Sequence, residues 1–165
     1  MRLKGIIAII ILILVGGTFV LVGADEAKKH EYVGVKKCKV CHKKDGIFES
    51  WSATTHATVY DKLTDADKAK DEYKKYYTTG VDVKGVLLEE VQCEACHGAG
   101  SDYKKKAIME DREKAVANGL VIPDEKTCKK CHNEKAPGKL GETGKTFDFV
   151  KMKAKGVHAM REKKK

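Results

Sequence analysis

All six cysteines of this 165-residue chain fall within three copies of one pattern, C-x-x-C-H. The copies are Cys38–His42, Cys93–His97 and Cys128–His132, called here the first, second and third motifs. Two thiols three residues apart lie on one face of a helical turn, so both can join the two vinyl groups of one porphyrin. The histidine that follows is then carried under the ring, where its imidazole binds iron. The spacing therefore predicts three covalently attached haem c groups.

The predicted site residues divide by role. The attachment thiols are Cys38, Cys41, Cys93, Cys96, Cys128 and Cys131, and the proximal iron ligands are His42, His97 and His132. Three disulfides are the ordinary interpretation of six cysteines in an exported chain, but they explain neither the fixed spacing nor the histidine after each pair. Structural zinc usually takes two paired half-motifs, and three units do not divide into such pairs, although Cys₂His₂ sites stay formally open.

Three histidines outside the motifs, His30, His56 and His158, match in number the three second axial positions. This matching count makes them the candidate distal ligands. Bis-histidine ligation favours low-spin iron and lower potentials than Met/His ligation. Methionines are weaker candidates here, because Met1 precedes the apolar run and Met109, Met152 and Met160 sit in Lys-rich, helix-like stretches.

The composition is too polar for an ordinary core, with 35% charged residues, 7% aromatic residues and a formal charge of +9. Nucleic acid is a poor partner for this charge, because 30 of the 33 basic residues are Lys and Arg is the better base reader and phosphate clamp. Without residues 1–24 the chain keeps 31 basic and 24 acidic residues. The propionates of three haems would add about six negative charges, so the excess of Lys largely balances the cofactors.

The amino terminus has the pattern of an export signal. A basic start, Met1–Lys4, precedes an apolar run from Ile6 to Val22, and small residues then lead to Ala24. These features predict a signal peptide over residues 1–24, or alternatively an uncleaved membrane anchor over residues 5–22. In both cases residues 25–165 form one exported domain, periplasmic or extracellular, which meets a membrane only if the segment is uncleaved.

The remaining patterns predict a mainly α fold with extensive loops, packed around the three haems, with little or no sheet. Helices are expected over residues 47–63, 65–77 and 147–160, and from a cap at Ser101 or Asp102 to a stop at Gly119. A polar lead-in is expected over residues 25–36, a turn over 80–85, a Gly-rich loop over 137–144 and a frayed tail over 163–165.

Three longer strings give the chain a resemblance to a known family. They run from Tyr32 to Ala57, from Val91 to Gly100 and from Phe147 to His158. Over about residues 32–160 the chain resembles the tetrahaem cytochrome c that takes electrons from hydroxylamine oxidoreductase, within a broader family of multihaem cytochromes. The resemblance implies that His56 ligates the haem of the third motif, and that His158 ligates the haem of the second.

Two departures from that family affect the expected function. The family's second haem motif, the one with an open coordination position, is replaced by residues 76–82, which contain no cysteine. Its loss favours pure electron transfer. The family's distal ligand to the first haem is also missing, because residues 101–106 contain no histidine. His30 is then the leading candidate there, with an open iron, Tyr103, a Lys or a Met as alternatives.

We therefore expect an electron carrier rather than an enzyme, with no catalytic residues and with other redox proteins as partners. Surface Lys residues would steer partners with acidic docking surfaces, and an oligomer is possible. Two alternatives remain at this point. One is an oxidoreductase acting on a small nitrogen or sulfur compound at an open first haem. The other is a subunit of an extracellular cytochrome filament.

Overall fold

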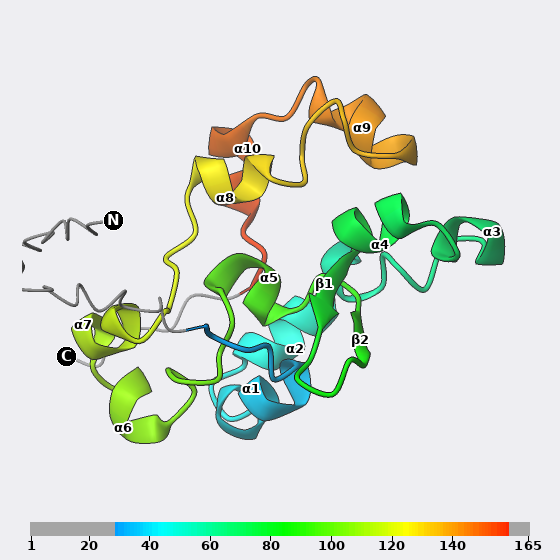
Figure 1. Cartoon of the computed structure of the whole chain (residues 1–165). Coiled ribbons are helices and arrows are strands. Elements are labelled where there is room, and N and C mark those ends of the chain that lie inside the picture. Colours follow the sequence, from blue (N-terminus) through cyan, green and yellow to red (C-terminus); the bar gives the residue numbers. More distant parts are fainter. Residues whose placement is uncertain (1–28, 159–165) are drawn as a thin grey trace, which may run out of the picture.

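The computed structural model describes residues 29–158 and confirms a mainly α fold with extensive loops (Figure 1). Its helices are short. They are α1 (Val35–His42), α2 (Ile47–Ser52), the 3₁₀ turn η1 (Thr55–Ala57), α3 (Asp65–Lys68), α4 (Asp71–Tyr77), α5 (Cys93–His97), α6 (Lys106–Met109), α7 (Arg112–Ala117), α8 (Glu125–Lys129), α9 (Gly138–Gly144) and α10 (Phe149–Lys155). Each haem-binding motif thus begins on or forms a helix, α1, α5 or α8.

The expected signal or anchor at residues 1–24, the start of the lead-in and the expected tail lie outside the described residues. Within residues 29–158, no helix is both long enough and apolar enough to cross a membrane. The described part of the lead-in, residues 29–34, is extended and passes directly into α1.

A two-stranded antiparallel sheet joins β1 (Thr78–Val81) to β2 (Leu87–Glu89), with Val81 opposite Leu87. The predicted turn lies between the strands. There the Asp82 carboxylate accepts hydrogen bonds from the backbone N–H groups of Lys84 (2.8 Å) and Val86 (3.0 Å). This small sheet agrees with the expectation of little or no sheet.

Two of the expected helices are shorter than their periodicity predicts. In residues 47–63, α2 ends at Ser52, where the Ser52 hydroxyl donates to the Glu49 carbonyl at 2.8 Å and the Thr54 hydroxyl to the Trp51 carbonyl at 2.7 Å. Such local hydroxyl bonds compete with helix continuation. Residues 65–77 form two helices, α3 and α4, which are separated at Ala69 and Lys70.

The cap predicted at Ser101 or Asp102 is wrong. The helical stretch divides into α6 and α7, and Asp111 caps α7 by accepting from the Lys114 N–H at 3.1 Å. Ser101 instead accepts from the Glu31 backbone N–H at 3.0 Å, because the lead-in runs beside it. The stop at Gly119 is confirmed, since this residue has a φ of +97°, which favours glycine.

The Gly-rich loop predicted over residues 137–144 is also wrong, because this segment forms helix α9. Its glycines serve close packing: a Cβ on Gly141 would collide with the Ala136 carbonyl, and one on Gly144 with the Asn133 backbone. The last helix, α10, begins after its cap at Asp148 and ends at Gly156, so it is shorter than residues 147–160.

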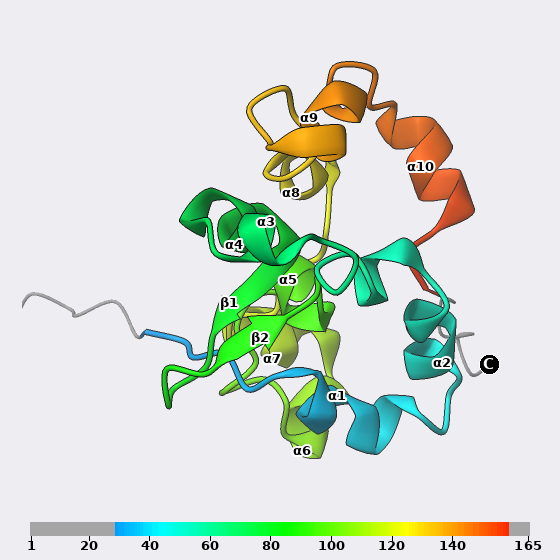
Figure 2. The same ribbon diagram turned by 90° about the vertical axis from the view of Figure 1, so that its right-hand side faces the viewer.

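The helices gather in two groups around a thin core. In both views α8, α9 and α10 lie on one side of β1 and α5, while α1, α6 and α7 lie on the other (Figure 1, Figure 2). Few apolar side chains are buried in the described residues: Trp51, Tyr60, Tyr77, Tyr103, Ala115 and Ala136. The elements that carry the motifs therefore have little apolar packing of their own.

Candidate haem-binding sites

The first two motifs are joined by one buried carboxylate. Glu94 lies between the cysteines of the second motif, and its side chain is 1% exposed. It accepts hydrogen bonds from the backbone N–H groups of Val33 (3.0 Å), Gly34 (2.7 Å) and Gly100 (2.6 Å). A carboxylate that replaces its water with several N–H donors is well compensated for burial. It fixes the start of α1 against α5.

A second set of long-range bonds extends this junction. The Gln92 side chain accepts from the Val35 N–H at 2.7 Å, which satisfies a donor in the first turn of α1. The Trp51 indole donates to the Val91 carbonyl at 3.1 Å, and the Val91 N–H donates to the His56 carbonyl at 3.0 Å. The backbone that carries His56 is therefore held against the approach to the second motif.

The six cysteines are all free thiols, and thiols of different motifs lie close together. Cys38 of the first motif and Cys93 of the second are in hydrogen-bonding contact, and this contact together with burial raises the pKa of Cys38. Burial, assisted by the nearby Cys128 and Cys131, raises the pKa of Cys96 to about 11. The attachment points of neighbouring motifs are thus adjacent in space.

At the second motif, the rings of His97 and His158 lie 6.0 Å apart, inclined by 37°. Nδ1 of His97 is 3.1 Å from the Val121 carbonyl, which can only accept, so Nδ1 is the donor and Nε2 keeps its lone pair. Desolvation lowers the pKa of His97 and favours the neutral imidazole that a metal requires.

At the third motif, the rings of His132 and His56 also lie 6.0 Å apart, inclined by 74°. Phe147 stacks on His132 with its ring centroid 4.6 Å away. Burial removes both histidines from water, and this desolvation lowers the pKa of each imidazole. His132 faces a hollow, partly open to solvent, that Phe147 and Met152 also line.

The spacing of both histidine pairs suits an iron between them. An imidazole nitrogen binds a metal at about 2.0 Å, and a ring centroid lies about 1.1 Å behind its nitrogen, so two axial imidazoles have centroids about 6.2 Å apart. The observed 6.0 Å agrees for both pairs. The structure thus brings together the pairs that the resemblance implied, while their binding of iron stays a prediction.

The first motif is built differently. Nδ1 of His42 is 3.0 Å from the Asp45 carboxylate, which orients the ring with Nε2 available. In the described part of the chain, no ring contact pairs a second imidazole with His42. The motif faces a hollow that is partly open to solvent.

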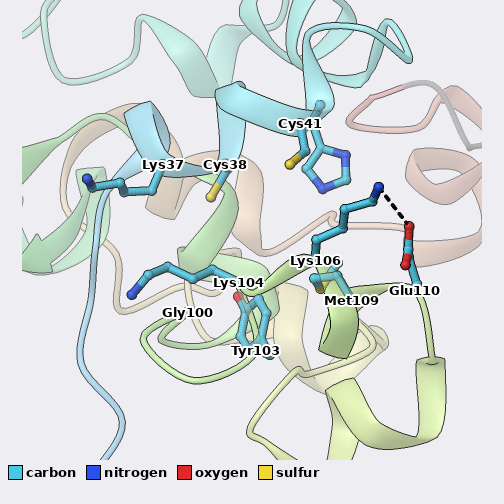
Figure 3. A pocket seen from close by; sticks show the side chains of 10 residues that line it. Lys37, Cys38, Cys41, Gly100, Tyr103, Lys104, Lys106, Met109 and Glu110 are labelled. Carbon is cyan, nitrogen blue, oxygen red and sulfur yellow. Dashed lines mark ion pairs between the residues drawn. The ribbon is translucent and has the colours of Figure 1, made fainter.

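Figure 3 shows this hollow, with Cys38 and Cys41 projecting from α1 on one side. Tyr103, Lys104, Lys106 and Met109 come from the opposite side. His30, the leading candidate for the distal position, does not line the hollow. Its Nδ1 lies 2.7 Å from the Asp102 carboxylate, so it is held in a different contact.

Sequence reasoning missed two functional side chains. Glu94 occupies a variable position of its motif, and only the three-dimensional path of residues 33, 34 and 100 reveals its role. Asp45 follows the first motif at a spacing of three residues from His42, a signal that could have been used. In residues 29–158 no cluster of three or more His, Cys, Asp or Glu is placed to hold a bare metal ion.

Comparisons with known proteins give one match. No curated protein matches the chain significantly. No solved structure matches it either. A family model described as "Outer membrane cytochrome MtrC/MtrF-like, domains II/IV" matches residues 22–164, which is most of the chain. The broad expectation of a multihaem cytochrome is thereby confirmed, with haem c binding and electron transfer as the family's properties. On this match, the chain belongs to the MtrC/MtrF-like outer membrane cytochrome family.

Proposed function

We propose that this chain is an exported cytochrome with three haem c groups, which passes electrons between redox proteins. The observation that carries the proposal is the pairing of motif histidines with distant ones. His97 with His158, and His132 with His56, each keep a spacing that suits two axial ligands of one iron. The haems supply the redox chemistry, and the chain supplies attachment, axial ligands and burial.

The adjacency of the motifs supports internal electron transfer. Electron tunnelling falls steeply with distance, so adjacent attachment points favour fast transfer from one site to the next. Cys38 contacts Cys93, and Cys128 and Cys131 lie near enough to Cys96 to raise its pKa. The second motif therefore lies next to both of the others, and electrons would enter or leave at the first or the third motif.

The chain's own residues hold each ligand in its binding form. Bonds at Nδ1 fix the rings of His42 and His97 with Nε2 directed to the metal position. Burial keeps His56, His97 and His132 neutral, with a lone pair to donate. Exposed Lys residues are available to haem propionates and to acidic partner surfaces, where attraction would fall with added salt.

Intact mass and a pyridine haemochrome assay on the exported protein test the haem number. We expect three haems per chain, all retained under denaturing conditions because each is held by two thioether bonds. Zero haems would overturn the proposal, and one or two would refute the trihaem assignment. Fractionation of the producing cells, with the mature amino terminus sequenced, would distinguish cleavage after Ala24 from an anchor over residues 5–22.

A second candidate function rests on the first motif alone. His42 faces a partly open hollow and makes no ring contact with a second imidazole in the described residues, which would suit an iron that binds a small nitrogen or sulfur compound. Low-temperature EPR of the oxidised protein separates the two functions. Three low-spin centres support the electron carrier, whereas one high-spin centre that responds to added ligand supports the enzyme.

A further inference from the structure

His30 is held in contacts outside the hollow at the first motif. Its Nδ1 is paired with Asp102 at 2.7 Å, and its ring packs beside Gly119. The approach to Gly119 is so close that a Cβ there would be 2.8 Å from Nε2. His30 does not line the hollow that Cys38, Cys41 and His42 face, so the residues that do line it are better placed to supply the distal ligand.

One wall of the hollow at the first motif carries side chains that could supply the distal ligand. Helix α1 brings Cys38, Cys41 and His42 to one wall, and residues 100–110 form the other. Lys106 and Met109 are one helical turn apart on α6, so they lie on the same face of that helix. In Figure 3 both lie across the hollow from Cys41.

The oxygen and nitrogen donors on that wall are engaged. The Tyr103 hydroxyl donates to the Gly98 carbonyl at 2.6 Å, and burial raises its pKa, so the phenol keeps its proton. The Lys104 ammonium donates to the Ser101 carbonyl at 3.0 Å. The Lys106 ammonium is 79% exposed and pairs with Glu110 at 3.6 Å. A protonated amine has no lone pair for a metal.

Met109 differs from these side chains in two ways. Its thioether has lone pairs at every pH and is an established axial ligand of haem iron. Its unbranched side chain has three rotatable bonds, so the sulfur can adjust its position when a porphyrin fills the hollow. Within residues 29–158, its sulfur makes no hydrogen bond that would have to break before it could bind a metal.

We propose that Met109 is the distal axial ligand of the haem attached at the first motif, opposite His42. This assignment rests on the proposed function, because it requires a haem at Cys38 and Cys41. It makes the first haem a His/Met centre beside two bis-histidine centres. Thioether ligation raises the reduction potential, so the first haem becomes the most oxidising of the three and the site where electrons collect.

The first test uses the unaltered holoprotein in its oxidised state. Near-infrared absorption and magnetic circular dichroism should show a thioether-to-ferric-iron charge-transfer band with the intensity of one haem in three. The absence of this band in protein that carries three haems would overturn the assignment. Fewer than three haems by the pyridine haemochrome assay would instead show that the proposed function fails.

Two variants then locate the ligand. Met109→Leu should abolish the band and convert one haem of three to high spin, and Met109→His should abolish the band while keeping all three haems low-spin. The matched control is Met152→Leu, since Met152 lines the hollow beside His132, which already faces His56. The control should leave the band intact. Loss of the band in Met152→Leu but not in Met109→Leu would overturn the proposal.

The competing ligands are tested in the same way. His30→Ala and Lys106→Ala should each keep three low-spin haems and the full charge-transfer band. Conversion of one haem to high spin in His30→Ala would refute the assignment and restore His30 as the ligand. The same result in Lys106→Ala would assign the position to the amine instead.

Discussion

The first and second motifs are tied to each other by long-range hydrogen bonds, whereas the helix of the third motif is capped by residues next to it in the sequence. Glu94 and Gln92 reach from the second motif and its approach to the backbone at the start of α1. The third motif begins on α8. The amino-terminal end of this helix is capped by a reciprocal pair of hydrogen bonds between Asp124 and Thr127. Its region contacts the rest of the chain through the ring of His132 beside His56, and through the Tyr77 hydroxyl, which donates to the Pro137 carbonyl at 2.8 Å.

This difference suggests two levels of cooperativity around the cofactors. Breaking the Glu94 junction should separate two haem sites at once, because one carboxylate serves both sides. Breaking the cap of α8 should loosen one site while the others stay in place. The chain has few buried apolar groups with which to compensate for either loss.

The largest effect is expected from Glu94→Ala. It leaves the N–H groups of Val33, Gly34 and Gly100 without their acceptor and should lower the free energy of unfolding by about 3–5 kcal/mol. Denaturant unfolding of the holoprotein, followed by Soret absorption, measures the loss. Glu142→Ala, at an exposed position of α9, is the control and should change stability by less than about 0.5 kcal/mol. Equal losses in the two variants would contradict a junction at Glu94.

His56→Ala should remove the imidazole opposite the third motif without dismantling the fold. The His56 carbonyl, which accepts from Val91, is kept, while the ring opposite His132 is lost. EPR should show one high-spin and two low-spin ferric centres. His158→Ala should give the same count but through the second haem, so the double variant should show two high-spin centres. If the double variant showed only one high-spin centre, both histidines would serve the same iron.

A smaller effect is expected where the lead-in packs beside the first two motifs. Gly119→Ala places a Cβ against His30 at a positive φ, whereas Gly85→Ala has a positive φ with open space around it. Backbone strain alone costs about 1–2 kcal/mol in each variant. Thermal unfolding of both holoproteins should therefore show the larger loss in Gly119→Ala, with its haem spectra unchanged. Equal losses would mean that His30 moves freely and is not packed as described.

Local signals in this sequence are easier to interpret than long-range ones. The C-x-x-C-H spacing is local and predicts the attachment residues of all three motifs, which stay predictions. The resemblance placed His56 opposite His132, a long-range pairing that helical periodicity could not supply. Periodicity overestimated helix length, because local hydroxyl bonds after Trp51 and a new cap at Asp111 end helices that an apolar pattern would continue.

Two expectations meet long-range contacts that the sequence does not reveal. Elimination makes His30 the leading distal candidate, but the structure places its ring beside Asp102 and Gly119, both some 70 or more residues away in the sequence. Residues 137–144 looked like a loop because four of the chain's glycines and prolines fall there, yet Gly141 and Gly144 allow a helix to pack against residues 133–136. Composition could not distinguish flexibility from close approach.

The smallest effect should come from Asp124→Ala, and it should stay within the third motif. The Asp124 carboxylate accepts from the Thr127 N–H at 2.8 Å, and this bond lowers the pKa of Asp124. A lowered pKa means that the cap stabilises the fold above the usual carboxyl range and is lost as pH falls through the lowered value. Hydrogen exchange should therefore speed up in α8 at neutral pH, with α1 and α5 unchanged, and the difference from wild type should shrink in acid. Asp124→Asn, which keeps an uncharged cap, should restore slow exchange without the pH dependence. Faster exchange in α1 or α5 would mean that the third motif supports the other two, and the division between tied and local motifs would be wrong.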